Sequence, residues 1–181
     1  MYTSVLEKIA RTLSVAAIPY MIIGGQAVLL YGEPRLTKDV DVTLGVDLEG
    51  LPEMIRLIEQ MQFDLLADPE TFTRQTLVLP CQDPDTGVRV DFIFSFSAFE
   101  QEALRRVNGV LINDTEVCFA SIEDLIIHKM VAGRPRDLED VKSVLNRNPD
   151  IDASYLRYWL QAFSAELGYA LLDQFEQIRS S

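Results

Sequence analysis

The chain has 181 residues, of which 48% are apolar and 24% charged, a composition that is ordinary for a soluble globular protein with a core of its own. Its net charge of −12 argues against a protein that binds nucleic acid through a broadly basic surface. The longest apolar-rich run, residues 18–31, is too short to span a bilayer, and the cysteines, Cys81 and Cys118, lack the spacing of a metal site. We therefore expect a cytoplasmic protein with reduced thiols and no membrane partner.

The first half of the chain alternates between helical and strand patterns. Apolar residues at helical spacing predict a helix over residues 3–17, and Pro19 ends it. The glycine pair Gly24-Gly25 then forms a turn between a short strand and a short apolar helix. In chain order, the patterns after Pro19 predict a strand at 20–23, a helix at 26–31, a strand at 40–44 and a helix at 51–61.

The second half begins with strand patterns and ends with helical ones. Strands are predicted at 75–79 and 88–94, a helix at 99–106, and a hairpin of strands at 110–112 and 115–119. Ser121 begins a helix that runs to about 132, and further helices follow at 137–145, 152–165 and 168–178. The predicted fold is α/β (α+β): a mixed sheet of about five strands flanked by helices, with a helical C-terminal part. We expect a core at 1–120 and a helical region at 121–181 that packs on it as a single compact unit.

Two aspartates one residue apart, Asp39 and Asp41, mark the predicted strand at 40–44. Because side chains alternate along a strand, both leave the same face, roughly 7 Å apart. Like charges repel one another unless a cation lies between them, and hard oxygen ligands favour Mg²⁺ or Mn²⁺. A solvated polar face is the alternative interpretation, because a short motif such as D-x-D often matches by chance.

The glycine pair, Gly24-Gly25, precedes the D-x-D motif by thirteen residues and lies where a strand turns into a helix. Free backbone N–H groups and the helix dipole favour an anion at such a junction, and glycine lets a phosphate approach closely. A plain tight turn is the alternative. Together, the two motifs predict a phosphate cradle beside a metal site.

A third acidic residue, Asp91, lies in the apolar segment 88-VRVDFIFSF-96. Burying an unpaired carboxylate is costly, so we expect this residue to have a partner. If its strand lies beside residues 40–44, Asp91 completes a cluster of three carboxylates around one or two metal ions, an arrangement suited to phosphoryl transfer. A solvent-facing residue at the edge of a strand is the alternative.

Over residues 18–94, these motifs resemble the hallmark of the polymerase-β-like nucleotidyltransferase superfamily: a glycine pair, a short helix, a D-x-D strand and a third acidic strand. Gly25 stands where the superfamily usually has serine, so a hydroxyl contact to phosphate is lost. The resemblance implies an Mg²⁺-dependent enzyme that moves a nucleoside monophosphate from a nucleoside triphosphate to an acceptor hydroxyl. Asp39, Asp41 and Asp91 would be its catalytic and metal-binding residues.

The segment 121-SIEDLIIHKMVAGRPRDLEDVKSVL-145 is similar to minimal nucleotidyltransferases, and among them to the abortive-infection toxins of toxin–antitoxin pairs. By this resemblance Lys129 contacts nucleotide phosphates, while Arg136 and Asp137 support the active site. Whether Asp137 or Asp140 is the functional acid stays open. Lysine and arginine near a helix end are also common without any catalytic role, which is the alternative.

Two basic residues, Arg35 and Lys38 in 35-RLTKDVD-41, fit the pattern of the same branch and are predicted, with Gly24 and Gly25, to bind nucleotide. The acceptor could be an RNA end such as that of tRNA, a protein hydroxyl or a small molecule, although the acidic surface disfavours a long nucleic acid. A cognate antitoxin is implied by the resemblance alone. The alternative functions are a non-catalytic nucleotide-binding or interaction module and a toxin controlled by a partner protein.

Overall fold

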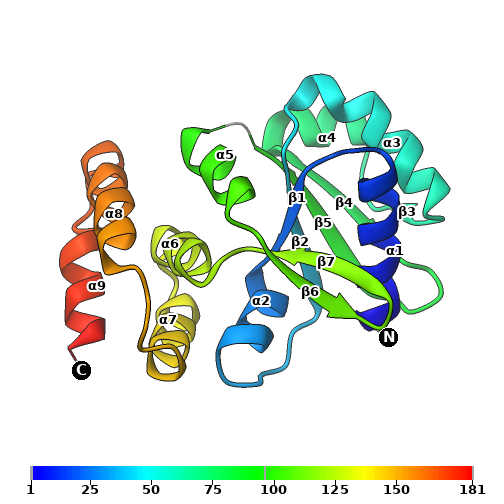
Figure 1. The fold of residues 1–181 in the computed structure, drawn as a ribbon. Coiled ribbons are helices and arrows are strands. Elements are labelled where there is room, and N and C mark those ends of the chain that lie inside the picture. Colours follow the sequence, from blue (N-terminus) through cyan, green and yellow to red (C-terminus); the bar gives the residue numbers. More distant parts are fainter. Residues whose placement is uncertain (1, 96, 181) are drawn as a thin grey trace. The chain divides into compact units, whose positions relative to one another are not determined.

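The computed structural model describes residues 2–95 and 97–180 (Figure 1). The chain forms two compact units: the first runs from the N-terminus to Gln26 and from Thr37 to Ala120, and the second comprises residues 27–36 and the chain from Ser121 onwards. The division falls within helix α2 (Gly24–Tyr31) and again before strand β2 (Asp39–Leu44). Residues 27–36 therefore belong with the C-terminal helices rather than with the sheet.

The first unit is built on a mixed sheet of seven strands in the order β3-β4-β5-β2-β1-β7-β6. Its strands are β1 (Tyr20–Ile23), β2, β3 (Asp64–Leu65), β4 (Val78–Gln82), β5 (Arg89–Phe94), β6 (Asn108–Ile112) and β7 (Thr115–Phe119). The mixed α/β fold is confirmed, with more strands than the expected five or so. The two-residue strand β3 was missed because it is too short to show the alternating pattern of a strand.

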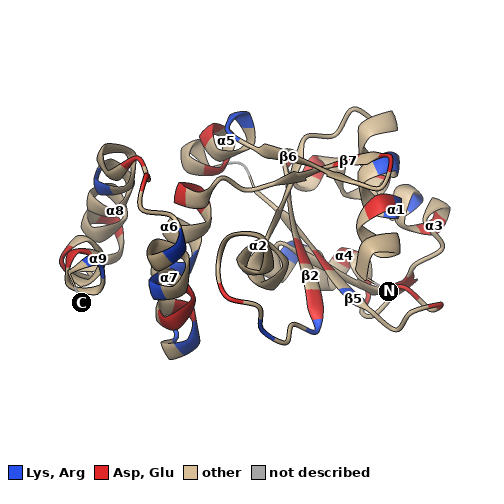
Figure 2. Cartoon of the chain, turned by 60° about the horizontal axis from the view of Figure 1, so that its bottom comes forward, with Lys and Arg blue, Asp and Glu red and all other residues tan. Residues whose placement is uncertain are grey.

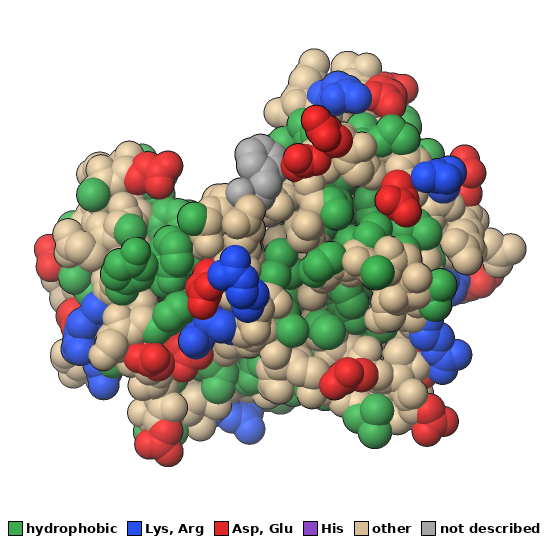
Figure 3. Space-filling model, turned by 45° about the horizontal axis from the view of Figure 1, so that its top comes forward, with side chains coloured by type: hydrophobic (Ala, Val, Ile, Leu, Met, Phe, Trp, Pro, Cys, Tyr) green, Lys and Arg blue, Asp and Glu red, His purple; other side chains and the backbone are tan. Residues whose placement is uncertain are grey.

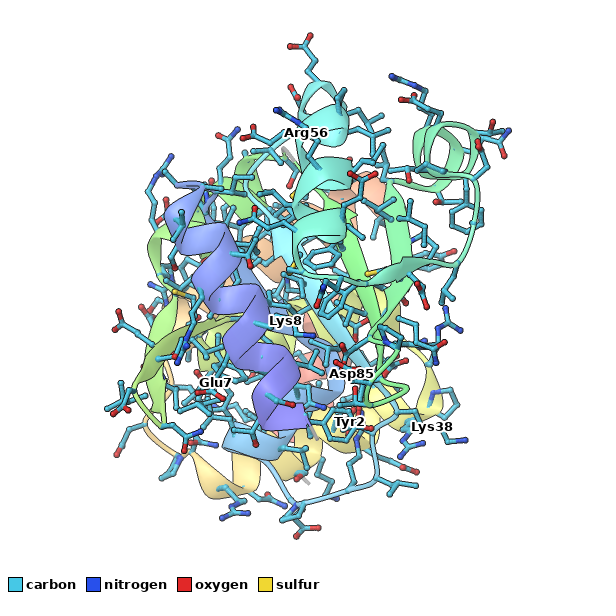
Figure 4. All side chains as sticks on the ribbon, turned by 90° about the vertical axis from the view of Figure 1, so that its right-hand side faces the viewer. Tyr2, Glu7, Lys8, Lys38, Arg56 and Asp85 are labelled. Atoms are coloured by element: carbon cyan, nitrogen blue, oxygen red, sulfur yellow. The ribbon has the colours of Figure 1, made fainter. Side chains whose placement is uncertain are left out.

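The core of this unit lies on one face of the sheet, beneath helices α1 (Tyr2–Val15) and α3 (Leu51–Gln60). Figure 4 shows these two helices over the same face of the sheet. Alternate residues of the central strands are fully or almost fully buried, as are the apolar faces of both helices. In the central strands these residues are Val40, Val42, Leu44, Val90, Phe92 and Phe94. This alternation leaves the intervening residues of β2 and β5 on the opposite face.

One predicted strand was placed wrongly. The strand expected at 75–79 is strand β4, Val78–Gln82, and the residues before it form helix α4 (Pro69–Thr76). Asp68 caps α4 by accepting a hydrogen bond from the Thr71 N–H at 2.8 Å, and proline at the first helical position adds a second start signal. These local signals outweigh the strand propensity of the threonines. Helices η1 (Leu48–Gly50) and α5 (Ala98–Arg105) complete the first unit.

The second unit is helical. It contains α6 (Ile122–Ala132), α7 (Pro135–Arg147), α8 (Ala153–Leu167) and α9 (Leu171–Arg179), and the predicted helices are confirmed to within three residues at each end. Its core gathers apolar residues that are at most 1% exposed, namely Leu125, Ile126, Ile127, Met130, Val141, Val144, Leu156, Leu160 and Phe175. Other hydrophobic side chains stay at the surface toward the left of Figure 3, where α8 lies, and Tyr158 is 67% exposed.

Both cysteines are free thiols, with Cys81 buried and Cys118 partly buried. Burial raises the pKa of each thiol, which keeps both in the neutral form at physiological pH. In the part of the chain that the structure describes, no helix combines the length and apolar character that crossing a bilayer requires.

Candidate active site

Three carboxylates lie on one face of the sheet in the first unit. Strands β2 and β5 run parallel, and their register sets Asp41 beside Asp91 and Asp39 beside Arg89. Side chains at matching positions of neighbouring strands leave the same face, so Asp39, Asp41 and Asp91 share it. All three are partly buried, and the acidic positions of β2 are red in Figure 2. The structure thus places the three acids that the sequence suggested on one face of two neighbouring strands.

Asp91 lies in an environment that disfavours its charge. Burial raises the pKa of its carboxyl group, the neighbouring Arg89 lowers it, and Asp39 raises it again, so that the pKa of Asp91 is above its ordinary value. Its Oδ1 atom is buried without a hydrogen-bond partner, and the guanidinium of Arg89 lies 3.7 Å from it. A buried acceptor left without a hydrogen bond is costly, and a cation would relieve that cost.

The residues on this face fit a hard divalent cation. Three carboxylates supply the oxygen ligands that Mg²⁺ and Mn²⁺ prefer, and the unpartnered oxygen of Asp91 is one of them. Within residues 2–95 and 97–180, no three acidic, histidine or cysteine side chains are close enough together to form a complete metal site. A cation bound here would therefore need rotation of these side chains or water ligands, and Mg²⁺ commonly retains several waters.

Gly24 allows the start of α2 to approach the D-x-D strand closely. Its φ of +62° is the left-handed conformation that glycine adopts most readily. A Cβ atom at this position would lie 2.9 Å from Cγ of Asp41 and closer still to its Oδ2. The helix was predicted to begin at 26, whereas it begins at Gly24, so Gly24 and Gly25 form its first turn. The backbone of Gly24 therefore lies directly beside the Asp41 carboxylate.

The segment that enters β2 is held within the first unit. The Tyr2 hydroxyl donates to the carbonyl of Thr37 at 2.7 Å, and the Thr37 hydroxyl donates to the carbonyl of Asp39 at 3.3 Å. Lys38, between them, has an exposed side chain, and Figure 4 shows it beside Tyr2 at one end of the sheet. The structure therefore leaves the predicted nucleotide-binding residue Lys38 open to solvent.

The other predicted basic and acidic residues lie in the second unit, in a buried charge network. Lys129 is only 7% exposed, and its Nζ lies 2.8 Å from Oδ1 of Asp137 and 2.9 Å from Oδ2 of Asp140. Arg35 binds both oxygens of Asp140, each at 2.8 Å, and the Arg134 Nε lies 2.6 Å from Oδ2 of Asp137. Figure 2 shows both signs of charge along α7.

This network engages both of the acids between which the sequence left the choice open, and it suggests another role for Lys129. Burial raises the pKa of Asp137, but hydrogen bonds from Arg134 and Lys129 outweigh it, so the pKa of this carboxyl is lowered. Asp137 and Asp140 both bind Lys129, so the structure uses the two acids together. A buried ammonium between two carboxylates has a structural role, which is an alternative to the predicted contact of Lys129 with phosphate.

Helix α7 also holds the segment between α2 and Leu36. Arg147 donates to the carbonyl of Gly32 at 2.7 Å, and the backbone N–H of Glu33 donates to the Ser143 hydroxyl at 2.6 Å. Arg136, predicted to bind nucleotide, is exposed and donates to the carbonyl of Leu36 at 3.2 Å. The pattern of apolar residues gave no signal for these contacts, because they join segments about a hundred positions apart.

Comparison with known families settles the class of protein. A family model described as a nucleotidyltransferase of unknown function (DUF6036) matches residues 3–161. This chain belongs to that nucleotidyltransferase family. The predicted enzyme class is thereby confirmed, and the motifs quoted above lie within the matched residues. No curated protein sequence matches the nucleotidyltransferase.

Several solved structures share the fold of this nucleotidyltransferase. An antigenic nucleotidyltransferase-like protein from Paracoccidioides brasiliensis is 18% identical with a TM-score of 0.59, over 96% of this chain and 91% of that chain. The antibiotic-resistance factor ANT(2'')-Ia is 16% identical with a TM-score of 0.63, over 97% of each chain. The lincosamide antibiotic adenylyltransferase LnuA is 14% identical with a TM-score of 0.53, over 75% of this chain and 91% of that one. Identities this low establish similarity of fold alone.

The raised pKa of Asp91 predicts how the nucleotidyltransferase responds to pH. A protonated Asp91 offers less negative charge to a cation, so Mn²⁺ affinity should fall on acidification at a higher pH than an ordinary aspartate would cause. In the metal-free protein the folded state binds this proton more tightly than the unfolded chain does. The contribution of Asp91 to the free energy of unfolding therefore decreases as pH rises through its raised pKa.

Titration of Mn²⁺ by electron paramagnetic resonance, at pH values from about 4 to 7, measures this dependence relative to the ordinary aspartate pKa. Asp91→Asn should flatten the acidic part of the profile. An unchanged profile in this variant would show that another group controls the pH response.

Proposed function

We propose that this nucleotidyltransferase transfers a nucleoside monophosphate from a nucleoside triphosphate to the hydroxyl of a small-molecule acceptor, with Mg²⁺ or Mn²⁺ held by Asp39, Asp41 and Asp91. The observation that carries the proposal is the register that sets Asp41 beside Asp91 on the face bearing Asp39, against the backbone of Gly24. The acids of two strands would hold the cation that the reaction requires, and the N–H groups at the start of α2 would receive a phosphate.

The chemistry assigns separate tasks to the residues of this face. Asp39 and Asp41 would hold the cation, which when bound neutralises developing charge on the phosphates. The acceptor oxygen bonds to the α-phosphorus, the bond from that phosphorus to the bridging oxygen of pyrophosphate breaks, and pyrophosphate leaves. The carboxylate of Asp91 would accept the proton of the acceptor hydroxyl through whichever oxygen the cation leaves free. Its raised pKa suits this role, because a base works best when its pKa lies nearer the working pH.

Two observations favour a small acceptor over a long nucleic acid. The net charge of −12 would repel an extended phosphate backbone. Among proteins of similar fold, ANT(2'')-Ia has been solved with adenylyl-2''-tobramycin and LnuA with lincomycin, and both ligands are small molecules. A small acceptor that carries a hydroxyl, and for electrostatic reasons a positive charge, is therefore the class we propose.

Release of pyrophosphate tests the proposal. The protein is incubated with Mg²⁺ and each of ATP, GTP, CTP and UTP, together with pooled hydroxylated amines such as tobramycin, with lincomycin, with tRNA or with unrelated protein. We expect release of pyrophosphate that depends on a small molecule and stops on chelation, and a product whose mass increases by one nucleoside monophosphate. Labelling of tRNA or protein instead would contradict the proposed acceptor, and triphosphate binding without transfer to any acceptor would contradict the proposed reaction.

The finer resemblance to abortive-infection toxins, and the cognate antitoxin that it implies, stay predictions. They rest on the segment 121–145, whose charged residues form the buried network described above. Growth arrest on expression of the chain, relieved by a neighbouring gene product that co-purifies with it, would support this branch. Normal growth at high expression would count against it.

A further inference from the structure

We propose that Arg89 is a nucleotide-binding residue whose guanidinium contacts the non-bridging oxygens of the substrate's triphosphate. The inference rests on the proposed function, because it assigns a phosphate ligand to the same site. Arg89 begins β5 and lies beside Asp39 in the register of the parallel strands, two residues before Asp91. Its side chain therefore projects from the same face of the sheet as the three carboxylates.

Arg89 is available to a ligand. Its side chain is 56% exposed, and its ion pair with Asp91 spans 3.7 Å, which is longer than a hydrogen bond. Across the residues that the structure describes, the guanidinium of Arg89 makes no polar contact besides this ion pair. A guanidinium has five N–H donors, so most of its hydrogen-bonding capacity is open to a substrate.

Three basic residues of the second unit that were predicted or found near the acids of α7 already bind carboxylates. Arg35 and Arg134 each bind a buried aspartate through two nitrogens, and the ammonium of Lys129 lies between two carboxylates. Arg89 differs from them in exposure, in the length of its ion pair and in its place on the acidic face. It is therefore better placed than Lys129 to meet phosphate.

The charges on this face explain why the substrate would draw Arg89 away from Asp91. A divalent cation held by the three carboxylates would offset two of their three negative charges, and a triphosphate would add anionic oxygens that compete with Asp91 for the guanidinium. The planar guanidinium of arginine can donate to two phosphate oxygens at once, and this bidentate contact is stronger than a single ion pair at the surface. An ion pair that spans 3.7 Å and whose guanidinium is 56% exposed contributes little to stability by itself, so Arg89 can change partners at small cost once a cation lies beside Asp91.

Binding of a fluorescent, non-hydrolysable triphosphate in the presence of Mg²⁺ tests the inference. We expect Arg89→Gln to raise the Kd by about 10- to 100-fold, as loss of charge-assisted hydrogen bonds does, and Arg89→Lys to have an intermediate effect. Binding of the matching nucleoside, which lacks phosphate, should be unchanged. In turnover the loss should fall mainly on KM, while the midpoint of thermal unfolding stays as in the wild type.

Arg74→Gln is the matched control. The Arg74 side chain is also 56% exposed and also pairs with a carboxylate, Glu70 at 3.0 Å, but it lies on α4. This variant should bind triphosphate as the wild type does. Wild-type affinity in Arg89→Gln, or an equal loss of triphosphate and nucleoside binding, would overturn the inference.

Failure of this inference can be told from failure of the proposed function by measuring Mn²⁺ binding in the same proteins. If the wild type binds Mn²⁺ and triphosphate, Asp41→Asn loses Mn²⁺ and Arg89→Gln keeps both, only the role of Arg89 is wrong. If the wild type binds neither ligand, the proposed function is wrong and the inference falls with it. Arg89→Gln should itself bind Mn²⁺ at least as tightly as the wild type, because a positive charge beside Asp91 is removed.

Discussion

Asp41→Asn should lower kcat/KM for nucleotide transfer by at least about 1,000-fold, because a bound cation contributes several kcal/mol of transition-state stabilisation and each 1.4 kcal/mol is tenfold in rate. Asp41 lies at the centre of the site, beside Asp91 in the register and against Gly24. Asparagine keeps the shape of the side chain and removes the charge that holds the cation. Initial rates of pyrophosphate release, with saturating Mg²⁺ and acceptor, measure the loss.

The stability of this variant separates a catalytic effect from misfolding. Removing one of three like charges on the same face should leave the midpoint of thermal unfolding unchanged or raise it. Asp64→Asn is the control, since Asp64 is an exposed acid on strand β3 of the same sheet. We expect this variant to keep wild-type activity. A fully active Asp41→Asn enzyme would show that the carboxylate face is not the metal site.

Lys129→Met should lower the free energy of unfolding by about 3–5 kcal/mol, the usual cost of removing one partner from a buried ion pair. Lys129 is 7% exposed and lies between Asp137 and Asp140, which are themselves buried. Methionine fills a similar volume but leaves the two carboxylates facing each other, with Arg134 beside Asp137 and Arg35 beside Asp140 to offset part of their charge. Urea unfolding followed by circular dichroism measures the change.

Lys142→Met provides a matched control, because Lys142 is an exposed lysine on α7 and its replacement should change stability by about 0.5 kcal/mol or less. Adding Asp137→Asn to Lys129→Met should recover part of the loss, since the two residues are in direct contact and their effects are not additive. If Lys129→Met instead unfolds like the wild type and loses triphosphate affinity, the phosphate contact predicted from the sequence is favoured over the structural role.

Patterns of local origin were predictable. The strand at Tyr20–Ile23, the helices of the C-terminal region and the D-x-D strand each show their periodicity within a few turns of chain, and all of them form. The strand placed at 75–79 was wrong because the capping signal at Asp68 and Pro69 lies outside the segment that was judged to be a strand. The start of α2 was placed too late because glycine is disfavoured inside helices but tolerated at their ends.

In the candidate site, too, local features of the sequence were predictable and contacts between distant segments were not. Asp39, Asp41 and Asp91 could be selected as candidates from the sequence, because acidic residues are unusual in an apolar strand. Their residue types and spacing are local features of the sequence. The role proposed for Arg89 could not be predicted, because an arginine at the start of a strand is ordinary until the register sets it beside Asp39. Lys129 looked like an exposed phosphate ligand because nothing local to it reveals that Asp137 and Asp140 enclose it.

By itself, the sequence determined the class of fold, the three acids with their glycine turn, and membership of a nucleotidyltransferase lineage, since each depends on residue type and short-range spacing. Only the tertiary structure decided which strands are neighbours, which charged side chains are buried together, and which basic side chain on the acidic face stays open to solvent. The physical reason is that pairing between strands and ion pairing between helices join positions far apart in the chain. Their energy depends on distance and burial in three dimensions, which residue order does not record.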